Sequence, residues 1–289
     1  MLPIGIALLL VLLTGEQPNE AHRRAIELYK AQKYSEAIAQ FEMAIQTEAP
    51  GSADYKESVL SIGQSYFMLS QAPKAIPWLE KAPSSSNEAN YMLGYAYLQT
   101  NQPGKSEAAF ARLFGMSPES AAGHLLAGQM MLKKDYDSEA AKEIEKALQL
   151  NAKLPEAHFL LGEIAIFRGR LDDAITELQK ELEVNPNLGK AWYRLGDAYA
   201  RKEQWDQAVP QLQRAVWLNP EFSGPYILLG KCYLKQGNTI NAEGILRRAL
   251  SLDPHNQQAN YLLGQTLMAA GKREEARAIL EKLKATRPE

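Results

Sequence analysis

One glycine position recurs at a constant interval through most of this chain. It stands at every 34th residue over six consecutive units: Gly94, Gly128, Gly162, Gly196, Gly230 and Gly264. A fixed period of this length indicates a repeat protein, in which each unit is one supersecondary element that cannot bury its apolar face alone. The chain of 289 residues is therefore expected to be a stack of such units rather than one globular core.

Three further positions keep the same period. A small residue stands twelve positions after each glycine: Ser106, Ala140, Ala174, Ala208, Ala242 and Ala276. A large apolar residue follows four positions later: Phe110, Ile144, Leu178, Leu212, Leu246 and Leu280. Five units close on a proline: Pro118, Pro186, Pro220, Pro254 and Pro288. The apolar spacing predicts two amphipathic helices of about a dozen residues in each unit.

Residues that stop helices stand where the predicted helices end. Gly169, Gly237 and Gly271 are expected to end the first helix in the left-handed conformation. The closing prolines are expected to end the second helix, because the residue before a proline avoids helical angles. The periodic glycine lies inside the first helix, where it costs about 1 kcal/mol relative to alanine. We expect close approach of two helix backbones to explain it, with Ala208 and its equivalents as the facing side chains.

The sixth unit carries the clearest motif. It reads Trp192-x2-Leu195-Gly196-x2-Tyr199, followed by Ala208 and Pro220. This pattern resembles the tetratricopeptide repeat (TPR) family, whose signature is W-x2-L-G-x2-Y, then A-x3-F, then P. The resemblance implies an all-α fold, a right-handed α-α superhelix (solenoid) of about eight helix-turn-helix repeats.

Two less regular units, around Gly63 and Ala25, precede the regular six. Their altered spacing predicts an insertion in the loop at 47–52 and a deletion near 83–86, because loops tolerate changes of length. The predicted solenoid spans residues 17–289, with repeats at about 18–54, 55–86, 87–120, 121–154, 155–188, 189–222, 223–256 and 257–289.

The first sixteen residues differ from the rest. Residues 2–13 carry no polar side chain, yet they are too few to cross a bilayer as a helix, which takes about 20 residues. They fit the apolar region of a signal peptide, although no Lys or Arg precedes them and no Ala-x-Ala cleavage pattern follows. We expect a protein that is secreted or periplasmic, at a bacterial cell envelope. The alternatives are an uncleaved membrane tether and a buried N-terminal helix.

Composition and motifs exclude several function classes. The 32 basic and 34 acidic residues argue against a general nucleic-acid binder. The single cysteine, Cys232, excludes an intramolecular disulfide and is expected to be a packed free thiol. The common catalytic motifs do not occur, so we expect no enzyme activity and no cofactor or metal. His124 and His158 occupy equivalent positions that predict packing between helices, whereas His22 and His255 are expected at the surface.

The resemblance also implies where a partner would bind, because in TPR proteins the first helices line a concave groove. The residues expected to face that groove are Tyr91, Tyr95, Phe159, Glu163, Lys190, Tyr193, Arg194, Asp197, Arg201, Lys231, Lys235 and Tyr261. Exposed aromatic residues among charges are typical of binding surfaces. The alternative is that these tyrosines only pack between repeats.

These expectations favour a non-enzymatic scaffold that binds a peptide or helix of a protein partner. Lys190 and Arg194 are similar to the basic pair with which some TPR proteins hold a C-terminal carboxylate, but Leu125, Gln129 and Leu160 leave that clamp incomplete. The alternative function is a structural assembly subunit, a homo-oligomer that associates through its terminal repeats. An enzyme with a site improvised in the groove is a third, disfavoured hypothesis. Contact with a membrane is expected only if the N-terminal segment stays uncleaved.

Overall fold

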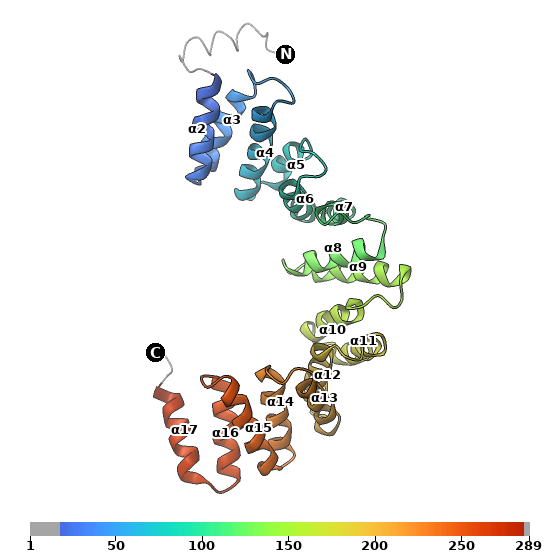
Figure 1. The fold of residues 1–289 in the computed structure, drawn as a ribbon, viewed down its shortest axis with the longest axis vertical. Helices are drawn as coiled ribbons and strands as arrows, with labels where there is room; N and C mark the ends of the chain where they lie inside the picture. The colour runs from blue at the N-terminus through green and yellow to red at the C-terminus, as the bar shows by residue number, and fades with distance from the viewer. Residues whose placement is uncertain (1–17, 286–289) are drawn as a thin grey trace. The chain divides into compact units, whose positions relative to one another are not determined.

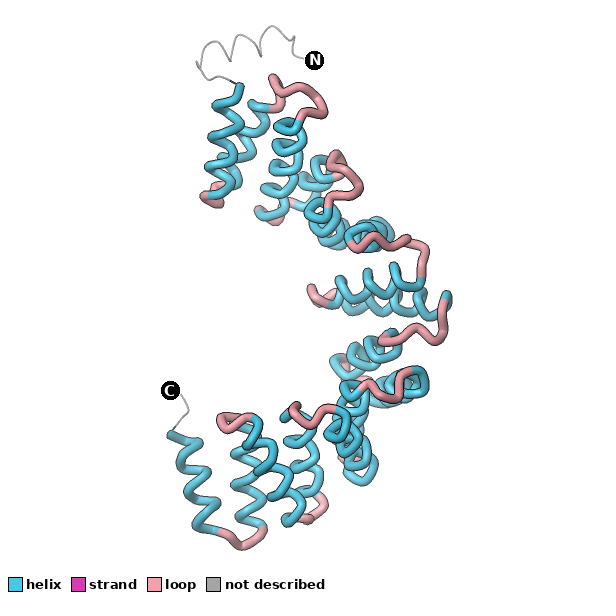
Figure 2. The backbone as a smooth tube through the Cα atoms, in the orientation of Figure 1, coloured by secondary structure: helices cyan, strands magenta, loops and turns pink. Residues whose placement is uncertain are grey.

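The computed structural model describes residues 18–285, which form sixteen helices and no strand (Figure 1 and Figure 2). The helices alternate as first and second members of eight pairs. The first helices are α2 (Pro18–Lys30), α4 (Ala53–Met68), α6 (Asn87–Gln99), α8 (Ala121–Leu132), α10 (Ala157–Phe167), α12 (Gly189–Arg201), α14 (Ser223–Lys235) and α16 (Gln257–Ala269). The second helices are α3 (Tyr34–Ala44), α5 (Ala72–Leu79), α7 (Pro103–Leu113), α9 (Asp137–Leu150), α11 (Leu171–Val184), α13 (Trp205–Leu218), α15 (Thr239–Leu252) and α17 (Arg273–Ala285).

The helices divide into two compact units, with the boundary between Ala152 and Lys153. The first unit contains α2–α9 and the second contains α10–α17. In each unit every helix packs against the next one in the chain. This arrangement confirms the predicted all-α solenoid. The predicted signal segment of residues 1–16 lies outside the described residues, and no helix within the described part has the length and hydropathy to span a bilayer.

First helices pack on one another across consecutive repeats. In the second unit α10 contacts α12, α12 contacts α14, and α14 contacts α16, while the first unit has the contacts α2–α4 and α4–α6. Consecutive second helices have no comparable contact among the described residues. The first helices therefore lie closer together than the second helices and form the inner surface of each unit.

The periodic glycine lets each first helix lie directly on its partner. A Cβ atom built on Gly196 would lie 2.6 Å from Leu212 Cδ2, and one built on Gly264 would lie 2.6 Å from Leu280 Cδ2. Such distances exclude a side chain at these positions unless the facing leucine or its helix shifts. The prediction of close approach is confirmed, but the facing group is the large apolar residue sixteen positions on. Ala208 contributes its backbone oxygen, 3.5 Å from the built atom, and not its side chain.

The turn between the two helices of a pair has one left-handed residue in every described repeat. Gly169, Gly237 and Gly271 adopt φ of 71°, 74° and 80°, as predicted. The same position is left-handed in the other repeats, where it is occupied by Gln32, Ser70, Asn101, Asp135 and Glu203. Helix pairing therefore imposes this conformation even on residues that adopt it at some cost.

The two irregular repeats change helix length more than loop length. Helix α4 has 16 residues where α6 has 13, and α5 has 8 where α7 has 11. The predicted deletion near 83–86 is therefore wrong, because the missing residues shorten α5. The predicted insertion at 47–52 mostly extends the start of α4. Helix α5 keeps its core contact despite the loss, because its last residue, Leu79, is fully buried and faces Gly63.

Candidate binding pocket on the second unit

The second unit has an open pocket on its first helices that brings five of the predicted groove residues together. Its volume is about 780 Å³. The five predicted residues are Phe159, Glu163, Lys190, Tyr193 and Arg194, from α10 and α12. The end of α13 and the loop before α14 complete the wall with Leu218, Asn219, Pro220, Glu221 and Phe222.

A buried carboxylate on α11 holds the start of α10. Helix α10 follows Glu156, which has a φ of 69°. The side chain of Glu156 makes no capping hydrogen bond to the helix. Glu181, which is 0% exposed, accepts hydrogen bonds from the backbone N–H groups of Glu156 and Phe159 at 2.9 and 3.2 Å. A negative charge is favourable at a helix N-terminus. Glu181 therefore fixes the first turn of α10 and, with it, the backbone of Phe159.

Two aromatic rings form the apolar wall of the pocket. The Tyr193 and Phe222 rings stand edge to face, with centroids 5.3 Å apart and an angle of 81° between their planes. Phe222 is 44% exposed, so part of its ring is open to a ligand. Burial, and secondly the charge of Asp197, raise the pKa of Tyr193 above its ordinary value. Its phenol therefore stays neutral and can donate a hydrogen bond at neutral pH.

The pocket carries one paired cation and one unpaired cation. Arg194 Nη2 lies 2.8 Å from Glu163 Oε1, and the guanidinium also lies 5.6 Å from the centroid of the Tyr193 ring. Lys190 is exposed, and no carboxylate of the described residues lies within ion-pair distance of it. Lys190 is therefore the group most available to an anionic side chain of a ligand.

The remaining predicted groove residues lie elsewhere. Asp197 and Arg201 form an ion pair of 3.1 Å along α12. Lys231 and Lys235 lie on α14, and Tyr261, which is 50% exposed, lies on α16.

In the first unit the two predicted groove residues differ from each other. Tyr91 is exposed, but Tyr95 is only 3% exposed. The Tyr95 ring packs against Phe110 with centroids 5.0 Å apart, and its hydroxyl donates to the Met130 carbonyl at 3.1 Å. Its predicted place on the binding surface is therefore wrong, because a neighbouring first helix covers it.

Sequence reasoning missed Phe222 because that residue is not on a first helix. Phe222 precedes α14. It stands at the repeat position that, in other repeats, holds the residue capping the first helix. Ser52, Ser86, Ser120 and Asn256 at this position accept a hydrogen bond from their own helix. Leu154, Leu188 and Phe222 stand there in the intervening repeats. The loss of a polar cap in favour of an exposed ring is the signal that would have identified Phe222.

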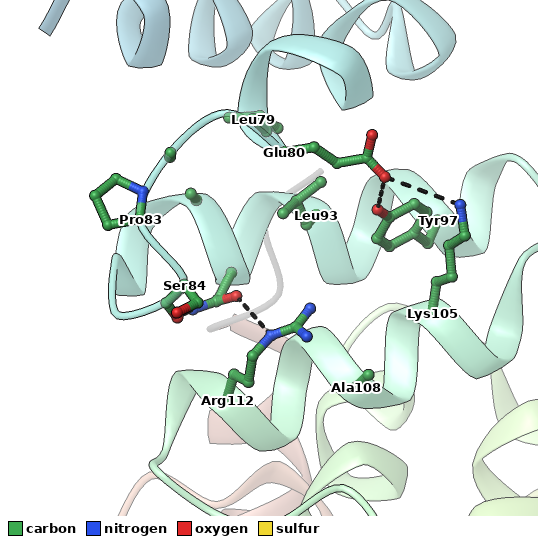
Figure 3. A pocket seen from close by; sticks show the side chains of 12 residues that line it. Leu79, Glu80, Pro83, Ser84, Leu93, Tyr97, Lys105, Ala108 and Arg112 are labelled. Carbon is green, nitrogen blue, oxygen red and sulfur yellow. Dashed lines mark hydrogen bonds and ion pairs between the residues drawn. The ribbon is translucent and has the colours of Figure 1, made fainter. Parts of the chain in front are cut away.

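A second pocket lies in the first unit, between α5, α6 and α7 (Figure 3). Its volume is about 450 Å³. Its polar groups pair with one another. Tyr97 Oη donates to Glu80 Oε1 at 2.5 Å, Lys105 Nζ lies 3.9 Å from the same oxygen, and Arg112 Nε donates to Asn90 Oδ1 at 3.4 Å. These side chains join neighbouring helices, so this pocket offers fewer free groups than the pocket on the second unit.

The predictions for Cys232 and the histidines had mixed outcomes. Cys232 is a buried free thiol, as predicted. His255 is exposed, whereas His22 is only 8% exposed, and its Nδ1 lies 2.7 Å from Glu48 Oε1. The expected surface position of His22 is therefore wrong, because it joins the first repeat to the second. His124 and His158 pack between helices as predicted, each beside a glutamate of the following helix.

Comparison with known proteins identifies the repeat. Family models described as tetratricopeptide repeat match residues 22–89, 91–155, 138–188, 159–226 and 193–239, and a further one matches 233–289. No curated protein matches the chain.

Solved structures share the fold. The crystal structure of YrrB, described as a TPR protein with an unusual peptide-binding site, is 25% identical with a TM-score of 0.55, over 61% of this chain and 91% of that chain. A crystal structure of MamA protein is 25% identical with a TM-score of 0.54, over 58% of this chain and 91% of its own. A MamA fragment from Desulfovibrio magneticus RS-1, 23% identical with a TM-score of 0.54 over 57% of this chain and 93% of its own, supports the fold alone.

Proposed function

This chain belongs to the tetratricopeptide repeat family, and on that premise we propose that it is a non-enzymatic scaffold that binds a segment of a partner protein. The observation that carries the proposal is the pocket of the second unit. Five predicted groove residues, among them the unpaired Lys190, meet there beside an exposed phenylalanine. The peptide-binding site described for YrrB supports a similar use of this fold.

The pocket favours one kind of segment. An aromatic or large aliphatic side chain would pack between Phe159, Tyr193 and Phe222, since edge-to-face ring contacts add to the gain from apolar burial. A carboxylate beside that side chain would pair with Lys190. A second anion has less to gain from Arg194, because Glu163 already holds that guanidinium at 2.8 Å.

A selection of displayed peptides against the full-length protein tests the proposal. We expect the selected segments to share an aromatic or large aliphatic residue next to an acidic one. Their affinity should fall at least about tenfold in Tyr193→Ala and in Lys190→Glu, as expected for an aromatic anchor and a desolvated charge pair. Trp217→Ala is the matched control, because Trp217 is 67% exposed on the second helix α13, outside the pocket. Peptides that bind parent, Tyr193→Ala and Lys190→Glu equally would exclude this pocket.

The alternative of a self-associating assembly subunit makes a different prediction. A scaffold that acts through its groove stays monomeric over a wide range of concentration, whereas an assembly subunit gains mass as concentration rises. Light scattering separates the two. Export through residues 1–16 is a further proposal, and N-terminal sequencing of the protein recovered from its host would show whether that segment is removed.

A further inference from the structure

Three ionisable side chains meet inside the first unit, and none of them is a predicted groove residue. His124 Nδ1 lies 2.9 Å from Glu107 Oε1 and 2.9 Å from Glu143 Oε2. The three residues come from α7, α8 and α9 and are 7%, 7% and 3% exposed for Glu107, His124 and Glu143. Their nitrogen and oxygen ligand atoms all lie within 4.8 Å of one another, which no other trio of such residues in the described part achieves.

A lysine holds the outer side of this cluster. Lys146 Nζ lies 2.8 Å from Glu143 Oε1 and 3.3 Å from Glu107 Oε2. These are the oxygens that do not face the histidine. One oxygen of each carboxylate therefore points at His124 Nδ1, and the other accepts from Lys146.

The centre of the cluster suits a cation. Two buried carboxylates face only one ammonium group, so a further positive charge between them is favourable. Either a proton or a metal ion compensates the remaining charge.

We propose that Glu107, His124 and Glu143 bind a divalent ion of the Zn²⁺ class. An imidazole nitrogen and two carboxylate oxygens are ligands that Zn²⁺ accepts, at about 2.0–2.2 Å, with a water in the fourth position. In a tetrahedral site these bond lengths separate neighbouring ligand atoms by about 3.3 Å. The two nitrogen–oxygen distances of 2.9 Å need to widen by only a few tenths of an ångström. Lys146 then holds the outer oxygens and orients the two carboxylates toward the ion.

The next repeat contains a natural comparison. His158, Glu177 and Lys180 stand 34 residues after His124, Glu143 and Lys146. His158 Nδ1 lies 2.6 Å from Glu177 Oε2, and Lys180 Nζ lies 2.8 Å from Glu177 Oε1, so the histidine–glutamate–lysine part is repeated. The residue 34 positions after Glu107 is Ala141. The second copy therefore lacks the third ligand and should not hold the ion.

In several other repeats the residue equivalent to His124 makes a hydrogen bond to the backbone. These residues are Asn90, Trp192, Tyr226 and Asn260, and each donates a hydrogen bond to the backbone oxygen six residues earlier. His124 instead directs Nδ1 at two carboxylates. His158 departs from the common contact in the same way by pairing with Glu177, but only His124 also meets a glutamate of the preceding helix.

Calorimetric titration of the full-length, chelator-treated protein with Zn²⁺ tests the proposal. We expect one equivalent of Zn²⁺ to bind to the parent, because the cluster offers one nitrogen and two oxygen ligands at a single point. His124→Ala and Glu107→Ala should weaken this binding at least about a hundredfold, since each removes one of only three protein ligands. His158→Ala is the matched control and should bind as tightly as the parent. Circular dichroism must show that all variants are folded.

The result has a second, independent readout. Bound Zn²⁺ should raise the melting temperature of the parent and of His158→Ala, because a ligand that binds only the folded state stabilises it. Glu107→Gln, which keeps the size of the side chain, replaces Glu107→Ala if the smaller residue prevents folding, and it should lose the shift. Binding that is equal in the parent and the His124 variant, or absent from the parent, would overturn the metal site and leave a proton at the centre of the cluster.

Discussion

Leu212 Cδ2 lies 2.6 Å from the point where a Cβ atom would stand on Gly196. The same relationship joins each periodic glycine to the large apolar residue sixteen positions on, for example Gly162 to Leu178 at 2.7 Å. The glycine is thus a packing requirement of every helix pair. A side chain at that position would force the leucine, or its helix, to move within the shared core, which is why the cost of a glycine inside a helix is tolerated.

We predict that Gly196→Ala destabilises the second unit by about 1–2 kcal/mol, because overpacking by a methyl group exceeds the gain in helix propensity. Urea denaturation followed by circular dichroism measures the change. Gly244→Ala is the matched control, since Gly244 lies inside helix α15 and a Cβ there meets nothing within 4 Å. That variant should be more stable than the parent by up to about 1 kcal/mol. If both substitutions changed the free energy of unfolding in the same direction, the packing argument would be contradicted.

Removal of the carboxylate that caps α10 should be costly. Glu181→Ala leaves the backbone N–H groups of Glu156 and Phe159 without their acceptor, so we expect a loss of about 2 kcal/mol in the free energy of unfolding. Glu183→Ala, two residues away and exposed, should change stability by less than about 0.5 kcal/mol. Because Glu181 fixes the backbone of Phe159, its loss should also weaken peptide binding. If Glu181→Ala were as stable as Glu183→Ala, Glu181 would not stabilise the first turn of α10.

The buried thiol should be unreactive in the folded protein. Burial raises the pKa of Cys232 to about 11, so only about 0.1% of it is thiolate at pH 8. We expect labelling by a disulfide reagent to be at least a hundredfold slower in native protein than in urea-unfolded protein. Rapid labelling of the native chain would show that the helices around Cys232 open readily.

One carboxylate should make stability depend on acid pH. Although burial opposes it, hydrogen bonds from Lys180 and His158 hold the pKa of Glu177 below its ordinary value. A depressed pKa stabilises the fold above the unfolded pKa, and this contribution is lost as pH falls through the folded pKa. We expect Glu177→Gln to cost about 1 kcal/mol at pH 7 and to approach the parent below about pH 4. Urea denaturation at several pH values checks this, and a difference that does not vary with pH would contradict it.

The 34-residue period predicted the fold because each repeat carries, at the same positions, the apolar residues that its two helices bury. Gly196, Ala208 and Leu212 recur at fixed offsets, and apolar spacing within one helix determines which of its faces must be covered. The same register identified Phe159, Glu163 and Tyr193 as residues of one surface, and the resemblance to the TPR family added Lys190 and Arg194. It also predicted the left-handed turns at Gly169 and its equivalents, because a local stop signal determines a local conformation.

Contacts between repeats were not predictable in this way. The sequence alone determined that this protein is a series of paired helices and which recurring apolar positions each pair buries. Only the tertiary structure decided that a neighbouring helix covers Tyr95, that Phe222 completes a pocket with Tyr193, and that Glu107 reaches His124 and Glu143. The physical reason is that periodicity specifies a face of one helix, whereas these contacts depend on how side chains of different length meet across the packing of successive pairs.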